Sequence, residues 1–430
     1  MIQILRFDDP GFESALQAII ARGEAPPQGV EEAVREIVAA VRQEGDAALC
    51  AYTARFDGLE LSPATLEVTP AERRQALVSV SPESLACLRL AAERIERFHA
   101  RQKEKSWLST DEEDLLLGQM VRPLDRVGIY VPGGKASYPS SVLMNAIPAK
   151  VAGVGEIIMV VPMPGGEVNP HVLAAAELAG VDRIFRIGGA QAVAALAFGT
   201  ESVPRVDKIT GPGNIYVATA KKQVFGQVDI DMIAGPSEIL VINDGSGEPS
   251  HIAADLLSQA EHDELASSVL VTTSDDFAGK VRQSLQEQLA ALPRQEIARR
   301  SIDRYGAIIV AGDLEEAIAF SNRIAPEHLE LAVDDPFAIL PKIRHAGAVF
   351  MGHHTPEAAG DYLAGPNHTL PTGGTARFFS PLGVEDFVKK SSIISMSRAG
   401  LERLGDAVVH LAGLEGLDAH GRSVSIRLRG

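Results

Sequence analysis

The sequence contains very little cysteine, a deficit of basic residues and no long hydrophobic run. Its 430 residues include two cysteines, Cys50 and Cys87, too few for a disulfide scaffold or a Cys-rich zinc site. Lys and Arg total 40 against 57 acidic residues, and the net charge of −17 argues against a nucleic-acid-binding surface. No apolar run approaches the ~20 residues that span a bilayer, and residues 1–6 lack a basic-then-apolar signal pattern. We therefore expect a cytoplasmic protein with neither nucleic-acid nor membrane partners.

Apolar residues make up 46% of the chain, which is ample material for packed cores. At roughly 100–200 residues per domain, the length suggests two to four structural units. From residue 126, short apolar runs alternate with helical patterns, which is typical of parallel sheets with crossover helices. We predict an α/β protein with two Rossmann-like parallel-sheet units. The predicted segments are a helical N-terminal region at 1–125, partly packed with the second α/β unit, a first α/β unit at 126–236, a second at 237–382, and a helical C-terminal tail at 383–430.

The two predicted series of strands follow from the apolar runs. The first comprises 127–131, 156–161, 183–187 and 206–209, and the second 239–242, 268–272, 307–310, 328–331 and 348–351. Glycine follows strand ends at 132–134, 188–189, 211–213 and 235. Such glycines either bring the backbone close to a ligand beyond the strand ends or simply make tight turns. Because Tyr216 stands where G-x-G-x-x-G needs its third glycine, any nicotinamide cofactor is expected to bind in a non-standard way.

Histidine is concentrated in the second half of the sequence, since only His99 and His171 precede residue 250. In the segment Gln-Ala-Glu-His at 259–262, Gln259 and His262 are three residues apart and would share a helix face. An amide oxygen and an imidazole nitrogen could bind one metal ion from there. The alternative interpretation is an ordinary polar helix end.

Three further segments combine acids with histidine. Glu327-His328 pairs a carboxylate with the usual general base, but both reach one site only if the backbone turns there; a surface Glu beside a capping His is the alternative. Asp361 lies in a Gly/Pro-rich stretch at 360–374, either a ligand loop or a structural Ω-loop. His420 lies in the tail, where a lone histidine is usually solvated. A Gln/His/Asp/His set of nitrogen and oxygen donors suits zinc or a related divalent ion.

Five segments, in their order and spacing, together resemble the histidinol dehydrogenase family, and the resemblance covers essentially the whole chain. They are 211–214 (GPGN), 231–238 (DMIAGPSE), 259–263 (QAEHD), 325–330 (APEHLE) and 360–372, which opens with GDY and closes with PT. The resemblance implies oxidation of L-histidinol to L-histidine with two NAD and one zinc ion, in histidine biosynthesis.

The resemblance also implies roles for individual residues. The implied zinc ligands are Gln259, His262, Asp361 and His420. The implied general-base pair is Glu327 and His328, and the implied NAD contacts are Tyr130, Gln191 and Asn214. The implied substrate contacts are Ser237, Gln259, His262, His328, Asp361, Glu415 and His420. The family is a homodimer, which implies that Glu415 and His420 come from the partner subunit.

A chemical hypothesis follows from these roles. His328 would take the alcohol proton, and Glu327 would activate the water that adds to the aldehyde, because neither cysteine lies near a motif to form a covalent adduct. Three alternatives stay open. They are a zinc hydrolase with Glu327 as base, a related dehydrogenase acting on another small alcohol, and a non-catalytic metal-binding protein.

Overall fold

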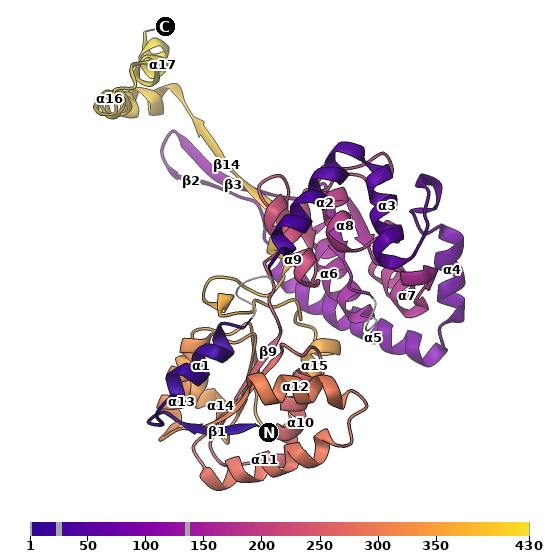
Figure 1. Cartoon of the computed structure of the whole chain (residues 1–430). Coiled ribbons are helices and arrows are strands. Elements are labelled where there is room, and N and C mark those ends of the chain that lie inside the picture. Colours follow the sequence, from indigo (N-terminus) through magenta and orange to yellow (C-terminus); the bar gives the residue numbers. More distant parts are fainter. Residues whose placement is uncertain (1, 23–27, 134–137, 430) are drawn as a thin grey trace. The chain divides into compact units, whose positions relative to one another are not determined.

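The computed structural model describes residues 2–22, 28–133 and 138–429. The chain forms two compact units, which are described separately below (Figure 1). The large unit comprises Met1–Gln102 and Asp125–Phe387, and the small unit comprises Lys103–Leu124 and Val388–Gly430. The predicted division of the chain into four segments, with boundaries after residues 125, 236 and 382, stays a prediction.

One sheet of the large unit has five parallel strands. In spatial order these are β6 (Arg183–Phe185), β5 (Glu156–Val160), β4 (Arg126–Tyr130), β7 (Lys208–Thr210) and β8 (Asp229–Ile230). The helices between successive strands are α6 (Pro139–Ala152), α7 (Pro170–Ala179), α8 (Gly189–Phe198) and α9 (Ile215–Val224). Asparagine side chains at 169 and 214 cap α7 and α9 by accepting hydrogen bonds from first-turn N–H groups. The glycine turns at 132–133, 188–189 and 211–213 lie at the carboxyl edge of this sheet, as predicted, whereas Gly134 lies outside the described residues.

The second sheet of the large unit has six parallel strands. In spatial order these are β1 (Gln3–Arg6), β11 (Gly306–Val310), β10 (Ser267–Thr272), β9 (Glu238–Asn243), β12 (His328–Ala332) and β13 (Ala348–Met351). Its connecting helices are α10 (Pro249–Ala260), α11 (Asp275–Leu289), α12 (Gln295–Tyr305), α13 (Leu314–Ile324) and α14 (Pro336–Ile339). Every residue of β9, β10 and β12 is buried, because helices cover both faces of a parallel sheet.

The N-terminal helices are divided between the two sheets. They are α1 (Phe12–Ile20), α2 (Val30–Glu44), α3 (Asp46–Asp57), α4 (Pro70–Ser79) and α5 (Pro82–His99). Phe12, Leu16 and Ile19 of α1 join the core of the six-stranded sheet, whereas α2 packs against α8 and α9 of the five-stranded sheet. The N-terminal region is thus not wholly helical, since β1 forms an edge strand of a parallel sheet before the first helix.

The small unit contains an antiparallel sheet and two helices. Its elements are β2 (Trp107–Glu112), β3 (Leu115–Pro123), β14 (Val388–Met396), α16 (Arg398–Leu414) and α17 (Asp418–Leu428). The tail predicted to be helical contains α16 and α17 but also the strand β14, and the N-terminal region contains β2 and β3. Five of the six residues in β2 are exposed, so the strand lacks the apolar alternation by which a half-buried strand is recognised.

Otherwise the α/β prediction with two parallel-sheet units is confirmed, and the predicted strands of both series coincide with observed ones to within a few residues. α15 (Glu357–Tyr362) is a short helix that the sequence analysis did not predict. Among the helices in the described part of the chain, none is both long and apolar enough to cross a membrane.

Candidate active site

The acidic and histidine residues gather at the amino edge of the six-stranded sheet. Glu238 opens β9 and His328 opens β12, and the two strands are hydrogen-bonded neighbours. α10 runs back from the carboxyl end of β9, so its last turn, with Gln259, returns to this same edge. Ligands of doubly wound sheets usually bind at carboxyl edges. The cluster on the second sheet therefore lies at the opposite edge, whereas the glycine turns of the first sheet lie at the carboxyl edge.

Gln259 is fully buried, and neither its amide oxygen nor its amide nitrogen has a hydrogen-bond partner in the described chain. An unpaired buried polar group costs about 1–3 kcal/mol, so such a side chain is typical of a site that binds a ligand. His262 lies two residues beyond the end of α10, and its N–H donates to the Gln259 carbonyl over 3.2 Å. The two residues therefore do not share a helix face as predicted, because the helix ends at Ala260.

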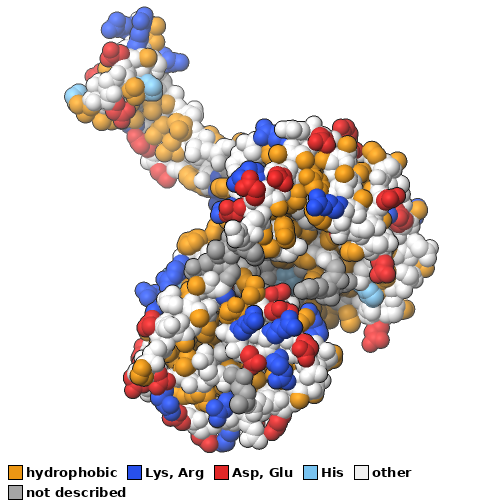
Figure 2. Space-filling view, in the orientation of Figure 1, with side chains coloured by type: hydrophobic (Ala, Val, Ile, Leu, Met, Phe, Trp, Pro, Cys, Tyr) orange, Lys and Arg blue, Asp and Glu red, His pale blue; other side chains and the backbone are white. Residues whose placement is uncertain are grey.

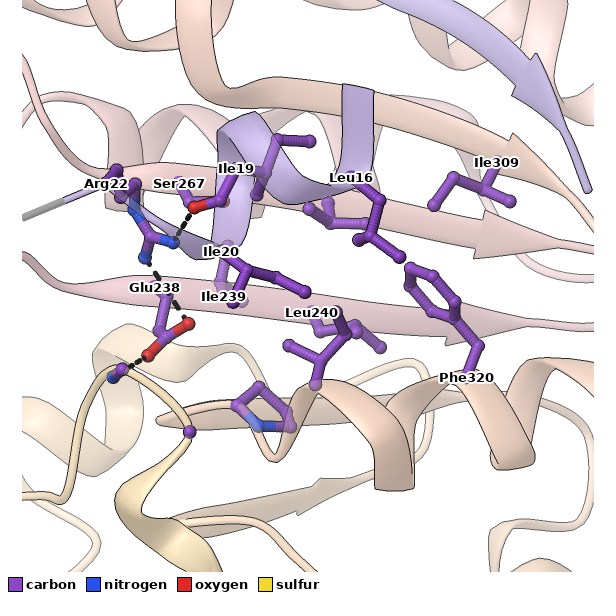
Figure 3. A pocket seen from close by; sticks show the side chains of 15 residues that line it. Leu16, Ile19, Ile20, Arg22, Glu238, Ile239, Leu240, Ser267, Ile309 and Phe320 are labelled. Atoms are coloured by element: carbon purple, nitrogen blue, oxygen red, sulfur yellow. Dashed lines mark hydrogen bonds and ion pairs between the residues drawn. The ribbon is translucent and has the colours of Figure 1, made fainter. Parts of the chain in front are cut away.

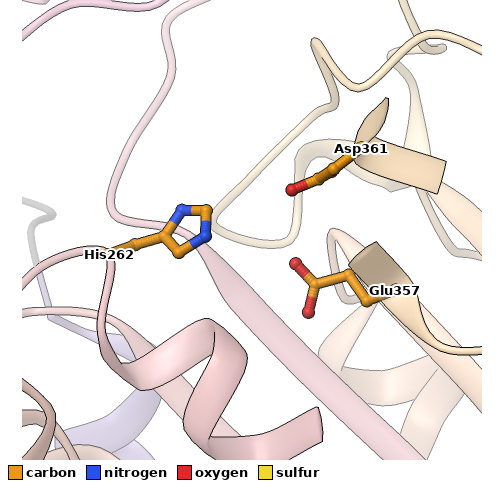
Figure 4. Close-up of side chains that lie close together, drawn as sticks. All are labelled: His262, Glu357 and Asp361. Atoms are coloured by element: carbon orange, nitrogen blue, oxygen red, sulfur yellow. The ribbon is translucent and has the colours of Figure 1, made fainter. Parts of the chain in front are cut away.

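His262 faces two carboxylates (Figure 4). Ligand atoms of His262, Glu357 and Asp361 all lie within 4.8 Å of one another. Glu357 and Asp361 are one helical turn apart in α15, which contacts α10 directly. Glu357 is 1% exposed, and both its carboxylate oxygens lack a hydrogen-bond partner among the described residues. Glu357 was not among the predicted site residues, because its four-residue spacing from Asp361 brings the two side chains together only in a helix, and a loop was expected at 360–374.

The carboxyl groups of this cluster oppose one another's ionisation. Burial raises the pKa of Asp361 to about 7. Burial, together with the neighbouring carboxylates of Asp361 and Glu327, raises the pKa of Glu357 well above its ordinary value. A divalent cation would remove this repulsion, because opposite charge favours the ionised form.

Glu327 and His328 reach the same site through the backbone of Glu238. The N–H of Glu238 donates to Oε2 of Glu327 over 2.9 Å, and the carbonyl of Glu238 lies 3.0 Å from Nδ1 of His328. A carbonyl only accepts, so Nδ1 of His328 carries the proton and Nε2 is the bare nitrogen. The chain turns just before the pair, where Ala325 adopts a left-handed φ of 54°. A turn at this point was the predicted condition for both side chains to reach one site.

The bare nitrogen of His328 points into the carboxylate cluster. Nε2 lies 3.7 Å from Oε1 of Glu357 and 4.0 Å from Oδ1 of Asp361. Burial lowers the pKa of His328 to about 3, and the imidazoles of His262 and His368 act in the same direction. Burial raises the pKa of Glu327 well above its ordinary value. A neutral imidazole beside a weakly acidic carboxyl group can accept one proton and share another.

His368 also belongs to this cluster, although the sequence analysis assigned it no role. Its Nδ1 lies 3.9 Å from Oδ1 of Asp361, and its Nε2 lies 3.5 Å from the hydroxyl of Ser141 in α6. Burial lowers the pKa of His368 to about 4. The stretch at 360–374 thus supplies a third imidazole beside His262 and His328, and that imidazole links the acidic cluster to α6, a helix of the first sheet.

The glycine loops of the first sheet form the other candidate surface. The phenol oxygen of Tyr130 accepts a hydrogen bond from the N–H of Gly189 over 3.0 Å, and burial raises its pKa to about 12. Gln191 is 1% exposed, and its amide oxygen has no partner among the residues described. Asn214 is exposed at the start of α9. Tyr130 and Gln191 thus border one loop, and Asn214 begins the helix after the next strand.

The remaining predicted residues occupy different places. Ser237 is partly exposed and immediately precedes β9. Glu415 follows α16 and His420 lies in the first turn of α17, and both are exposed residues of the small unit. The large unit therefore brings together His262, Glu327, His328 and Asp361 but contains neither Glu415 nor His420.

The donors of the cluster are imidazole and carboxylate, and Gln259, three residues before His262, carries an unpaired buried amide. Such nitrogen and oxygen donors suit zinc or a related divalent ion, and the unsatisfied atoms of Gln259 and Glu357 fit a cation. Thiolate ligation does not arise here, because Cys50 lies in α3 and Cys87 in α5.

Solved structures first define the class of fold. The chain resembles a crystal structure of an acetylating aldehyde dehydrogenase from Geobacillus thermoglucosidasius with a TM-score of 0.50, over 90% of this chain and 96% of that one. At 13% identity this likeness shows the fold alone. The crystal structure of histidinol dehydrogenase from Elizabethkingia anophelis is far more similar, with a TM-score of 0.93 and 38% identity over 100% of this chain and 98% of that one.

Sequence comparisons then identify the family. The histidinol dehydrogenase family profile matches residues 20–428. A curated histidinol dehydrogenase from Syntrophotalea carbinolica is 76% identical over 429 residues, covering 100% of both chains. The chain belongs to the histidinol dehydrogenase family. It is therefore an enzyme of the NAD-dependent oxidoreductase class, as predicted.

Proposed function

We propose that this protein oxidises L-histidinol to L-histidine through the aldehyde, reducing two NAD, with one zinc ion per subunit, in cytoplasmic histidine biosynthesis. The observation that carries the proposal is the placement of the bare His328 nitrogen beside the cluster of His262, Glu357 and Asp361. A base and a set of metal-type donors then face one small volume, where an alcohol could be oriented and deprotonated. Family membership supplies the substrate class.

In this proposal, Gln259, His262, Asp361 and His420 would hold the zinc ion, and Glu357 offers a further oxygen donor at the same place. When bound, zinc would orient the nitrogen atoms of the substrate, and NAD would accept the hydride. Tyr130, Gln191 and Asn214 are the proposed cofactor contacts. The buried, unpaired amide oxygen of Gln191 supports this assignment, because it is available to a donor on the ligand.

His328 is the proposed base for the alcohol. Its Nδ1 proton is fixed on the Glu238 carbonyl, so Nε2 is free to take the hydroxyl proton. The low pKa of about 3 keeps the imidazole neutral throughout the neutral range, so Nε2 has a free lone pair there.

Glu327 is the proposed group for the second oxidation. The aldehyde must first add water, and a carboxylate with a raised pKa is a stronger base than an exposed one, which suits removal of a proton from that water. Ser237, Gln259, His262, His328, Asp361, Glu415 and His420 are the proposed substrate contacts. The carboxylate of Glu415 would form an ion pair with the ammonium group of the substrate.

A homodimer with shared active sites accounts for the placement of Glu415 and His420 in the small unit. That unit carries an exposed apolar surface (Figure 2), with Ile394 71%, Leu411 60% and Leu414 71% exposed. Apolar side chains gathered in this way are typical of an interface. A second copy of the chain is the proposed occupant, and its sites would take Glu415 and His420 from this unit.

The decisive experiment is turnover with L-histidinol and NAD, followed by absorbance at 340 nm. We expect two NADH per histidinol consumed, and complete loss of activity when zinc is chelated. A zinc hydrolase would leave the absorbance unchanged. Preference for another small alcohol would leave the protein an NAD-dependent dehydrogenase but would contradict L-histidinol as its substrate. The matched control omits histidinol.

Complementation tests whether the sites are shared. His262→Ala and His420→Ala chains, each inactive alone, would regain about a quarter of wild-type activity when unfolded together and refolded, because half of the sites in half of the dimers are intact. If His420 acts within its own chain, the mixture stays inactive.

A further inference from the structure

The backbone of one residue, Glu238, contacts both proposed catalytic residues, Glu327 and His328. Its N–H holds the carboxylate of Glu327 at 2.9 Å, and its carbonyl holds the imidazole of His328 at 3.0 Å. A displacement of Glu238 along β9 would therefore move both side chains together. Hydrogen bonds of this kind set the direction of a catalytic group as well as its distance from the substrate.

The side chain of Glu238 is itself anchored by an ion pair and a hydrogen bond (Figure 3). Its Oε2 lies 3.3 Å from Nη2 of Arg22, and its other oxygen accepts a hydrogen bond from the N–H of Gly373. The side chains of Arg22 and Glu238 are 3% and 6% exposed. The ion pair thus joins the segment after α1 to the first residue of β9.

Arg22 is held as firmly as its partner. Its Nε donates to the carbonyl of Leu265 over 3.1 Å, and its Nη1 donates to the carbonyl of Ile19 over 2.7 Å. Every guanidinium nitrogen therefore has a partner in the chain. The planar guanidinium cannot rotate without breaking at least one of these bonds, so it fixes the Glu238 carboxylate in one place.

The surroundings of the pair are mainly apolar, with Leu16, Ile20, Leu240 and Phe320 lining the same small pocket. Removing two charges from water is costly, and a well-packed apolar pair of similar volume is often as stable or more stable. Stability alone therefore does not explain an ion pair at this position. A buried pair does, however, impose one geometry on the groups attached to it.

We propose that the Arg22–Glu238 ion pair is a positioning device that holds Glu327 and His328 in their working orientation. The proposal rests on the proposed function of these two residues. Arg22 and Glu238 would not touch substrate or cofactor; they would act through the backbone of Glu238. Loss of the pair should consequently lower turnover without weakening substrate or cofactor binding.

Two substitutions remove the pair in different ways. Arg22→Met keeps the length of the side chain but removes its charge and donors, and Glu238→Gln keeps an acceptor for Gly373 while removing the negative charge. Because both side chains of the base pair depend on Glu238, kcat should fall by about 10-fold to 100-fold in histidinol oxidation and in histidinal oxidation alike. KM for histidinol and for NAD should stay within about threefold of wild type, since the proposed metal ligands and NAD contacts do not depend on Glu238. Arg22→Lys, which retains the charge, should recover part of the loss.

A matched control breaks another ion pair of α1. Glu13 of α1 pairs with Arg323 of α13 on the surface, and Glu13→Gln should leave kcat unchanged. Circular dichroism and zinc content measured on every variant establish that the folded, metal-loaded protein is being compared.

The possible outcomes separate the two proposals. A wild-type protein that does not reduce NAD with histidinol would overturn the proposed function, and the positioning role with it. An active wild type together with folded Arg22→Met and Glu238→Gln that keep kcat would overturn only the positioning role. A change confined to KM would also overturn the positioning role. The same holds for a loss of activity that accompanies loss of the fold and is not relieved in Arg22→Lys.

Discussion

The ammonium group of Lys221 and the carboxylate of Asp231 form an ion pair with side-chain exposures of only 3% and 1%. Both partners also bind the backbone of Gly211, whose N–H donates to Asp231 over 2.8 Å and whose carbonyl accepts from Lys221 over 3.0 Å. Gly211 has a φ of 109°, and a Cβ there would lie 2.1 Å from the carbonyl oxygen of Tyr130. The pair therefore fixes a tight loop at the carboxyl edge of the five-stranded sheet.

Breaking this pair on one side should be costly. We expect Lys221→Met to lower the free energy of unfolding by about 3–5 kcal/mol, because it leaves the carboxylate of Asp231 buried without a counter-charge. Urea unfolding measures the change. Lys222→Met is the matched control: its neighbouring, exposed ammonium lies 3.8 Å from Glu31, and its loss should cost below about 1 kcal/mol. Similar losses in the two variants would contradict the importance of burial.

Gln259 should contribute to zinc binding and, in the metal-free protein, should lower the stability of the fold. Gln259→Met removes two unpaired buried polar atoms at similar volume, so the metal-free variant should be at least as stable as the metal-free wild type. The rise in Tm on adding zinc should shrink, because one proposed ligand is lost. Thermal unfolding with zinc and with chelator measures both effects. Gln283→Met, on the exposed face of α11, should change neither; an undiminished zinc response in Gln259→Met would remove Gln259 from the ligand set.

The large unit was predictable from sequence because its strands are buried on both faces. The run at 239–242, for example, is uniformly apolar, and β9 there is uniformly buried. The exposed β2 lacks such a pattern, and β1 pairs with β11 roughly 300 residues further along the chain, a contact that local periodicity does not encode.

The candidate site was predictable only in part. The residues at 259–262, 327–328 and 361 were predicted as metal ligands or catalytic groups from their motifs. Glu357 lies outside these motifs, and only the helix α15 brings it beside Asp361. The unpaired state of its oxygens and of the Gln259 amide is a property of packing, not of residue type. The support of Glu327 and His328 comes from backbone atoms of Glu238, and no residue type in the sequence marks a backbone contact of this kind.

The two cysteines should be dispensable. Cys87 is exposed on α5, and Cys50 is partly buried on α3, where burial raises the pKa of its thiol and so disfavours the nucleophilic thiolate. The double variant Cys50→Ala/Cys87→Ala should keep kcat within about twofold of wild type, because neither thiol is needed for a covalent intermediate. Steady-state rates with histidinol and with histidinal test this. A folded but inactive double variant would favour a covalent route.

Glu72 should contribute stability that depends on pH. Burial opposes its charge, but the ion pair with Arg186 and the hydrogen bonds from Thr69 outweigh burial and lower its pKa from 4.5 to about 2. A group with a depressed pKa stabilises the fold above its unfolded pKa and loses that contribution as pH falls towards the folded value. Glu72→Gln should therefore lower Tm at pH 7, and the difference from wild type should shrink progressively below about pH 5. A difference that is constant between pH 7 and pH 4 would contradict this assignment.

The carboxyl group of Glu327 should matter more for the second oxidation than for the first. Glu327→Gln keeps an oxygen that can accept from the N–H of Glu238, so the position of the side chain and the orientation of His328 should persist. Histidinol oxidation to the aldehyde needs the base at His328 and should stay within a few-fold of wild type.

Histidinal oxidation needs water activated by a carboxyl group, and its rate should fall by about 10²–10⁴-fold in Glu327→Gln. Single-turnover measurement of NADH from each substrate separates the two steps. The companion variant His328→Asn should instead slow the alcohol step, since it removes the bare nitrogen beside Glu357 and Asp361. Equal losses of both half-reactions in Glu327→Gln would show that Glu327 acts through His328, because a carboxyl group that only orients the imidazole affects every step that the imidazole performs.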